Sequence, residues 1–177
     1  QCDVDIIGSN SLLNEVELVM IFDEALSNLG LSDFTVKLNN RKILAGLVEH
    51  IGAGDQFMAV TIALDKFDKI GEDGVRNELE KLGISTSDAD TLMSILSFEG
   101  NAQAKLDQLS NVLKGSELGM KGVDEMQFIF DKLSELEIRN AKIDLDIKLA
   151  RGLNYYTGCI FEVAAGGVSI GSICGGG

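Results

Sequence analysis

Apolar residues recur every three or four positions through most of the chain, which is the spacing of amphipathic helices. The first such stretch covers residues 16–29 and is followed by Gly30, and a second covers residues 41–51. After Gly52 the pattern predicts further helices with no strand signal between them. These helices are expected at residues 56–70, 74–82, 87–98, 103–113 and 123–136.

Alternation of apolar and polar residues, which is typical of β-strands, occurs near both ends of the chain. Strands are expected at residues 1–7, 34–39, 143–149, 159–164 and 168–173. A helical block placed between two halves of one mainly antiparallel sheet explains this order better than two consecutive domains. We therefore expect an α+β fold in which residues 1–52 and 123–177 form the sheet domain and residues 53–122 form a helical insertion.

The composition narrows the class of protein. Of 177 residues, 45% are hydrophobic and 24% are charged, so a sizeable buried core is expected. No apolar run is long enough to span a membrane, and the first residues do not resemble a signal peptide. Cys2, Cys159 and Cys174 show no CxxC spacing and the single histidine, His50, has no companion ligand, which favours reduced thiols and no metal site. These features predict a cytoplasmic protein that does not bind membranes.

The net charge of −13 predicts that this chain alone binds nucleic acid weakly. Between Asp55 and Lys114 there are eleven acidic and six basic residues. We expect this part to touch RNA only through a few residues such as Lys105 and Lys114, and to act mainly as a mobile lid. The chain begins at Gln1 and ends on three glycines within an expected strand and turn, so we expect it to be a piece of a longer protein.

Candidate chemistry is concentrated in LARGLNYYTGCIFE, residues 149–162. Arg151 supplies a guanidinium beside Gly152, where the backbone can approach a ligand closely. Tyr155 and Tyr156 supply two phenols; if the backbone is extended they point to opposite faces, so that one of them packs into the core. The alternative for Arg151 is an ordinary surface arginine.

The expected first strand adds two further polar groups. Gln1 and Asp5 are four residues apart and would lie on the same face of a strand. Together with the groups of residues 149–162 they provide an amide, a carboxylate, a guanidinium and two phenols, which suits a small zwitterion with a polar side chain. The competing interpretation is that Gln1 and Asp5 form the solvated face of an edge strand.

The stretch LARGLNYYTGCIFE closely resembles the histidine-specific signature of histidyl-tRNA synthetases, which usually has the form RGLDYYTG followed by a short strand. QCDVDIIG, at residues 1–8, resembles the strand that closes motif 2 of this family. KLNNRKIL, at residues 37–44, resembles the segment between these two in the eukaryote-like branch. Asn154 departs from the pattern, because the family commonly has Asp there.

This resemblance implies the catalytic domain of a class II aminoacyl-tRNA synthetase. Such enzymes condense histidine with ATP, which carries Mg²⁺, to give histidyl-adenylate, and then transfer the histidyl group to tRNA(His). The resemblance also implies a homodimer for the intact enzyme. Motif 1, the motif 2 arginine, the motif 3 arginine and the anticodon-binding domain are not in this sequence, so the chain by itself is expected to be inactive.

The resemblance also implies roles for five residues. Gln1 would receive the α-amino group of histidine, and Asp5 would face the imidazole. Arg151 would be the catalytic residue, bridging the histidine carboxylate and the α-phosphate of ATP. Tyr155 and Tyr156 would line the same histidine pocket.

Two other functions compete with this interpretation. Synthetase-like chains also serve as a regulatory subunit of ATP phosphoribosyltransferase in histidine biosynthesis; the helical block argues against this, because the resemblance implies that regulatory members are more compact. A helical interaction module with an appended sheet is a further alternative. It leaves the signature at residues 151–158 unexplained.

Overall fold

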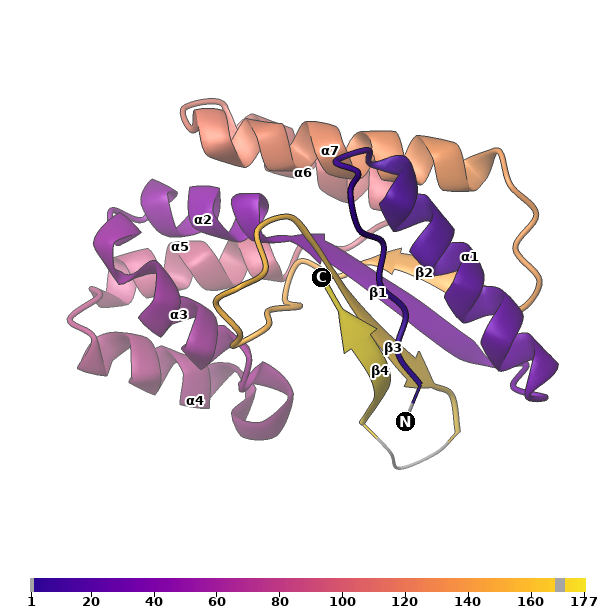
Figure 1. The fold of residues 1–177 in the computed structure, drawn as a ribbon. Coiled ribbons are helices and arrows are strands. Elements are labelled where there is room, and N and C mark those ends of the chain that lie inside the picture. The colour runs from indigo at the N-terminus through magenta and orange to yellow at the C-terminus, as the bar shows by residue number, and fades with distance from the viewer. Residues whose placement is uncertain (1, 168–170) are drawn as a thin grey trace.

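The computed structural model describes residues 2–167 and 171–177 (Figure 1). Its elements are α1 (Leu13–Asn28), β1 (Phe34–Asn40), α2 (Arg41–His50), a short 3-10 turn (Gly54–Gln56), α3 (Phe57–Leu64), α4 (Phe67–Lys81), α5 (Thr86–Leu96), α6 (Ala102–Leu113), α7 (Glu117–Ser134), β2 (Ala141–Leu145), β3 (Cys159–Ala165) and β4 (Ser172–Gly176). The helices expected at residues 16–29, 41–51, 87–98, 103–113 and 123–136 are present with shifted ends. None of the helices within the described residues is long and apolar enough to cross a membrane.

Side chains at the helix starts explain several of these boundaries. Asn40, Ser85, Asn101 and Ser116 each accept a hydrogen bond from a backbone N–H in the first turn of α2, α5, α6 and α7 respectively. The expected helices at residues 56–70 and 74–82 are instead divided between α3 and α4. Gly71, with a φ of 67°, kinks α4.

The sheet has four strands within the described residues, in the order β2-β1-β3-β4. The β1–β3 and β3–β4 pairs are antiparallel and the β1–β2 pair is parallel, so the expected α+β fold with a mainly antiparallel sheet is confirmed. Parallel neighbours require a long crossover connection. Here that crossover contains all the helices from α2 to α7.

The expected strand at residues 1–7 is wrong for residues 2–7, and residue 1 lies outside the described part. Residues 2–7 are irregular, and most of them are exposed. An alternating sequence forms a strand only where a neighbouring strand can satisfy its backbone hydrogen bonds, and no described strand pairs with this segment. The expected strand at 168–173 corresponds to β4, and residues 168–170 lie outside the described part.

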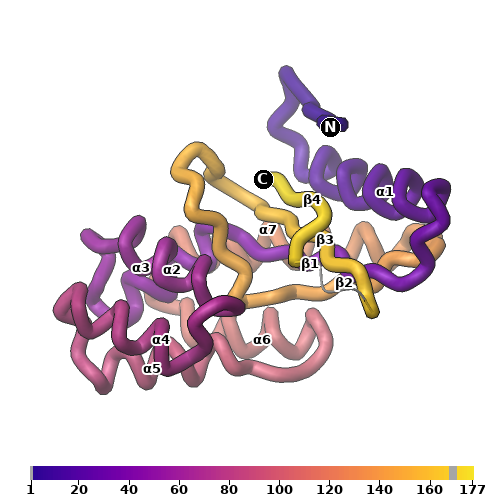
Figure 2. The backbone as a smooth tube through the Cα atoms, turned by 90° about the horizontal axis from the view of Figure 1, so that it is seen from below, coloured from indigo at the N-terminus to yellow at the C-terminus, as the bar shows by residue number. Residues whose placement is uncertain are grey.

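One face of the sheet forms the core. Val36 and Leu38 on β1 are fully buried, and they lie opposite Val163 and Phe161 on β3. The ring of Phe22 on α1 lies 6.0 Å from that of Phe161 in an edge-on contact, so α1 covers this face. Figures 1 and 2 show α2, α3, α4 and α5 gathered to one side of the sheet.

Helices α2 and α7 pack closely because small residues meet at their contact. A Cβ added at Gly46 on α2 would lie only 2.7 Å from the Cα of Gly119 on α7. Helix α7 begins at Glu117 and therefore runs across the expected domain boundary at residues 122–123. The division into a sheet domain and an insertion at residues 53–122 stays a prediction.

A buried carboxylate fixes the start of β2. Asp23 on α1, 1% exposed, accepts hydrogen bonds from the backbone N–H groups of Arg139, Asn140 and Ala141 at 2.7, 3.0 and 2.8 Å. Burial alone would raise the pKa of Asp23, but these donors outweigh burial and lower the pKa below its ordinary value. The carboxylate therefore ties α1 to β2.

Candidate functional site

Side chains of the segment 37–44 donate hydrogen bonds to the loop of residues 149–158, which carries the signature. Asn39 Nδ2 donates to the carbonyl oxygens of Ile147 at 3.0 Å and Leu149 at 2.9 Å. The fully buried Asn39 is at the end of β1, so it anchors the entry to the loop. The structure thus brings together two of the three segments that carry the family resemblance.

Arg41 holds the middle of the loop. Its Nη1 donates to the carbonyl oxygens of Arg151 and Leu153, each at 3.0 Å. Its guanidinium also lies 5.1 Å from the ring centre of Phe57 and contacts the sulfur of Met58, both on α3. Arg41 is 5% exposed, and burial lowers its pKa below the usual arginine value. One side chain therefore connects the helices beside the sheet to the signature loop.

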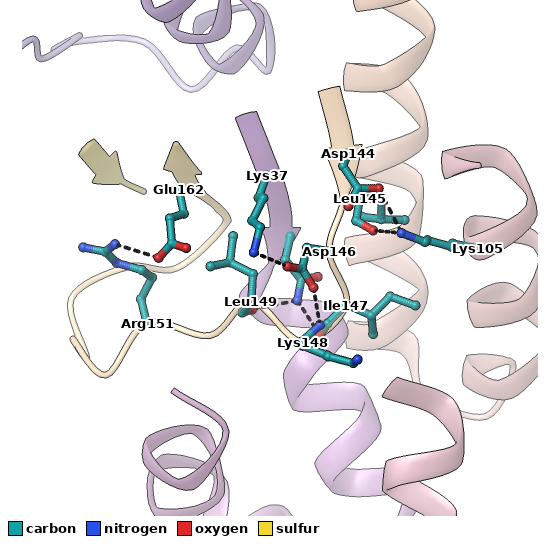
Figure 3. A network of polar contacts seen from close by, with 11 residues as sticks. Lys37, Lys105, Asp144, Leu145, Asp146, Ile147, Lys148, Leu149, Arg151 and Glu162 are labelled. Carbon is teal, nitrogen blue, oxygen red and sulfur yellow. Dashed lines mark hydrogen bonds and ion pairs between the residues drawn. The ribbon is translucent and has the colours of Figure 1, made fainter. Parts of the chain in front are cut away.

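The sheet face opposite the core carries a network of charges (Figure 3). Lys37 on β1 lies directly opposite Glu162 on β3, and Lys37 Nζ is 3.1 Å from Asp146 Oδ2. Arg151 Nη1 is 4.0 Å from Glu162 Oε2. Burial opposes the charge on Lys37, but Asp146 and other nearby carboxylates outweigh burial and raise its pKa.

Glu162 is the carboxylate at the centre of this network. Burial raises its pKa, and Asp68 and Asp146 raise it further, while Lys37 and Arg151 act in the opposite direction. The net effect is a carboxyl group that takes up a proton at higher pH than an ordinary glutamate. Its charged form depends on the two flanking cations.

Tyr155 and Tyr156 pack against each other. Their ring centres are 4.4 Å apart and their hydroxyl oxygens are 3.4 Å apart. The two side chains were expected on opposite faces only if the backbone were extended, and this condition is not met, because the backbone turns here. Tyr156 packs against the core as expected for one of the pair, whereas Tyr155 is 66% exposed.

The hydroxyl of Tyr156 is influenced by both neighbours. The hydrogen bond with Tyr155 raises the pKa of Tyr156, burial raises it further, and Arg151 lowers it; the net pKa is raised. A Cβ added at Gly177 would lie 2.8 Å from the Tyr156 ring, so this ring lies directly over the glycine-rich end of the chain. Arg151 and Tyr156 therefore come together over β4 and the residue after it.

Two hollows lie near these helices and strands. A polar cavity of about 50 Å³, large enough for water, lies beside the charge network. It is lined by Lys37, Leu64, Asp65, Phe67, Asp68, Asp146, Lys148, Leu149, Ala150 and Glu162. A wider groove of about 500 Å³ lies between α2, α3 and α7, and none of the expected site residues lines it.

The five expected site residues are not equally placed. Arg151, Tyr155 and Tyr156 lie on one loop, and Arg151 acts on Tyr156 electrostatically. Asp5 is exposed on the irregular segment before α1, and Gln1 lies outside the described residues. The convergence of all five on one pocket stays a prediction.

Sequence reasoning missed the residues that support the loop. Lys37, Asn39 and Arg41 all lie in KLNNRKIL, a segment noted only for its resemblance to the family. Glu162 closes the stretch LARGLNYYTGCIFE, where it was only part of an expected strand. For Lys37 and Glu162 the available signal was a charged residue within an expected strand, since a buried charge needs a partner.

Lys105 is not placed as expected for an RNA contact, and the environment of Cys159 limits its reactivity. Lys105 was expected to contact RNA, but its side chain is 13% exposed and its Nζ binds Asp144 at 2.9 Å and the carbonyl of Leu145 at 2.7 Å. Burial raises the pKa of the Cys159 thiol well above its usual range, so it is not a nucleophile near neutral pH. Over residues 2–167 and 171–177, no cluster of three or more His, Cys, Asp or Glu side chains is suited to hold a metal ion.

A family profile and the similar proteins found by comparison agree on one family. A profile described as histidyl-tRNA synthetase matches residues 1–177. The histidine–tRNA ligase of Flavobacterium johnsoniae is 53% identical over 178 residues, which cover 100% of this chain and 38% of that protein. The ligase of Christiangramia forsetii is 51% identical, with 100% of this chain and 39% of that protein covered. The chain thus spans about two fifths of the length of these relatives.

Two solved structures share the fold. A histidyl-tRNA synthetase from Nostoc sp. PCC 7120 matches with a TM-score of 0.86 and 32% identity, covering 96% of this chain and 40% of that chain. A Bacillus halodurans structure described as an ATP phosphoribosyltransferase regulatory subunit/histidyl-tRNA synthetase matches with a TM-score of 0.78 and 25% identity. That match covers 97% of this chain and 44% of the other.

Proposed function

Since the chain belongs to the histidyl-tRNA synthetase family, we propose that it forms part of the catalytic domain of a histidine–tRNA ligase. The intact protein would condense histidine with ATP to give histidyl-adenylate and pyrophosphate, and then transfer the histidyl group to tRNA(His). The observation that carries this proposal is the placement of Arg151, from the signature loop, beside Glu162 on the sheet face opposite the core. We also propose that the intact protein acts as a homodimer in the cytoplasm.

Arg151 is the proposed catalytic residue. A guanidinium is planar, remains charged at neutral pH and can bind a carboxylate or a phosphate through two parallel N–H bonds. Bridging the histidine carboxylate and the ATP α-phosphate would align the two reacting groups. It would also offset the negative charge that builds on the phosphate in the transition state.

The remaining pocket residues would select histidine. An imidazole presents one N–H donor and one acceptor nitrogen, so a carboxylate and a phenol are suitable partners. Asp5 would accept the N–H, and the hydroxyl of Tyr156 would face the second nitrogen. Gln1 would receive the α-amino group, and Tyr155 would line the same pocket.

ATP would be a substrate, accompanied by Mg²⁺ on its phosphates. The described side chains offer no cluster suited to hold the ion by themselves.

The decisive experiment is histidine-dependent exchange of pyrophosphate into ATP, measured with the full-length protein. Exchange that depends on histidine, and not on other amino acids, is expected. Its absence, together with no charging of tRNA(His), would reject the proposal.

A second candidate function is regulation of ATP phosphoribosyltransferase. It is supported by the match to the Bacillus halodurans structure, which is described as an ATP phosphoribosyltransferase regulatory subunit/histidyl-tRNA synthetase. A regulatory subunit would stimulate or inhibit ATP phosphoribosyltransferase in response to histidine, without forming an adenylate. Mixing the full-length protein with that enzyme, with and without histidine, separates the two functions.

A further inference from the structure

Three residues lie side by side across neighbouring strands on the sheet face opposite the core. Lys37 on β1 is opposite Glu162 on β3, and Glu162 is opposite Gly175 on β4. Residues directly opposite each other in adjacent strands point to the same face. The side chains of Lys37 and Glu162 and the vacant position above Gly175 therefore form one row.

The guanidinium of Arg151 fills the end of this row. A Cβ added at Gly175 would overlap Arg151 Nη1, and it would lie 3.2 Å from Arg151 Cζ and 2.9 Å from the carbonyl oxygen of Phe161. The carbonyl belongs to the backbone of β3 and cannot move aside. A side chain at position 175 would therefore displace the guanidinium and would also press on the backbone of β3, so glycine suits this close approach.

Glu162 lies behind the same guanidinium. The Glu162 and Arg151 side chains are 21% and 23% exposed, so this pair is largely shielded from water. Lys37 lies opposite Glu162 in the neighbouring strand, acts on it electrostatically, and forms an ion pair with Asp146 (Figure 3). Charges thus alternate along the row, and each carboxylate is fixed by a cation.

We propose that Glu162 is a positioning residue for Arg151, and that Gly175, by lacking a side chain, leaves the space that the guanidinium occupies. The role rests on the proposed function, because a fixed guanidinium matters only if Arg151 acts on the substrates. A free arginine side chain has many rotamers, and fixing it before the substrates bind removes that entropic cost from the reaction. At 4.0 Å the contact between Arg151 Nη1 and Glu162 Oε2 is an ion pair beyond hydrogen-bond distance, so it leaves N–H donors of Arg151 for a carboxylate or a phosphate.

Three variants of the full-length protein test this role. Glu162→Gln keeps the shape of the side chain and removes its charge, and Gly175→Ala places a methyl group in the space that the Arg151 guanidinium occupies. Gly176→Ala is the matched control, because a Cβ at this neighbouring strand position meets nothing within 4 Å. The measurements are histidine-dependent ATP–pyrophosphate exchange, histidine binding by calorimetry and thermal unfolding.

Glu162→Gln and Gly175→Ala are expected to lower kcat for exchange by about 10- to 100-fold, with little change in histidine affinity. Gly176→Ala is expected to match the wild type. The acidic limb of the kcat–pH profile is expected to change in Glu162→Gln, because protonation of Glu162, which faces Lys37, Arg151, Asp68 and Asp146, would release Arg151. A merely structural role would leave this limb in place.

The possible failures are distinguishable. No exchange by the wild type would overturn the proposed function and the positioning role together. An active wild type with Glu162→Gln and Gly175→Ala equal to Gly176→Ala would overturn the positioning role alone, as would an equal loss of kcat and histidine affinity. If Gly175→Ala does not fold, the isosteric Glu162→Gln variant decides.

Discussion

Replacing the buried Arg41 with methionine is expected to destabilise the protein strongly, although Arg41 has no carboxylate partner among the described residues. Methionine keeps an unbranched apolar chain but leaves the carbonyls of Arg151 and Leu153 without their donor. Two hydrogen bonds from a charged donor are together worth about 3–6 kcal/mol. Removing a buried charge recovers roughly 2 kcal/mol, so the net loss of unfolding free energy is expected to be about 1–4 kcal/mol.

Arg76 provides a matched control. It makes ion pairs with Glu72 and Asp90, yet it lies on the surface of α4. Exposed ion pairs contribute little to stability, so Arg76→Met should change the free energy of unfolding much less than Arg41→Met. Urea unfolding of the full-length variants, followed by circular dichroism, gives both values. The reasoning would be refuted if Arg76→Met cost as much as Arg41→Met.

Other predictions concern the fold and the RNA contact. The lowered pKa of Asp23 stabilises the folded state above pH 3.8, and this stabilisation is lost as the pH falls through the lowered pKa. The loss of unfolding free energy caused by Asp23→Asn, measured in urea, should therefore shrink on acidification. A loss that stays constant with pH would contradict this. Gly46→Ala should cost about 1–3 kcal/mol by forcing apart α2 and α7, whereas Gly54→Ala, which meets nothing within 4 Å, should be tolerated; equal unfolding midpoints would argue against this. Lys114→Ala should reduce the salt dependence of tRNA binding by about one phosphate contact, and a much larger drop in a filter-binding titration would show that Lys114 does more.

The sequence determined the local structure and the identity of the signature. Helical periodicity located every helix, because the apolar face of a helix leaves a repeat that does not depend on its partners. The strands β1 and β3 were likewise evident from composition and alternation. The stretch at residues 149–162 also indicated the family, because an ordered set of seven matching residues carries its information without coordinates.

Contacts between distant residues were decided only by the tertiary structure. The alternating residues 2–7 did not form a strand, because alternation cannot provide the neighbouring backbone that a strand needs. Lys105, which seemed available to RNA from its position in a polar helix, is paired with Asp144 thirty-nine residues away.

The support for Arg151 is the clearest example. Arg41 reaches the loop carbonyls across 110 residues, and the register of β3 with β4 places Gly175 opposite Glu162. The local sequence pattern does not specify strand register or the direction of a side chain, since both depend on how the elements pack. The sequence therefore indicated candidate residues for the chemistry, whereas packing decided which residues hold those candidates in place.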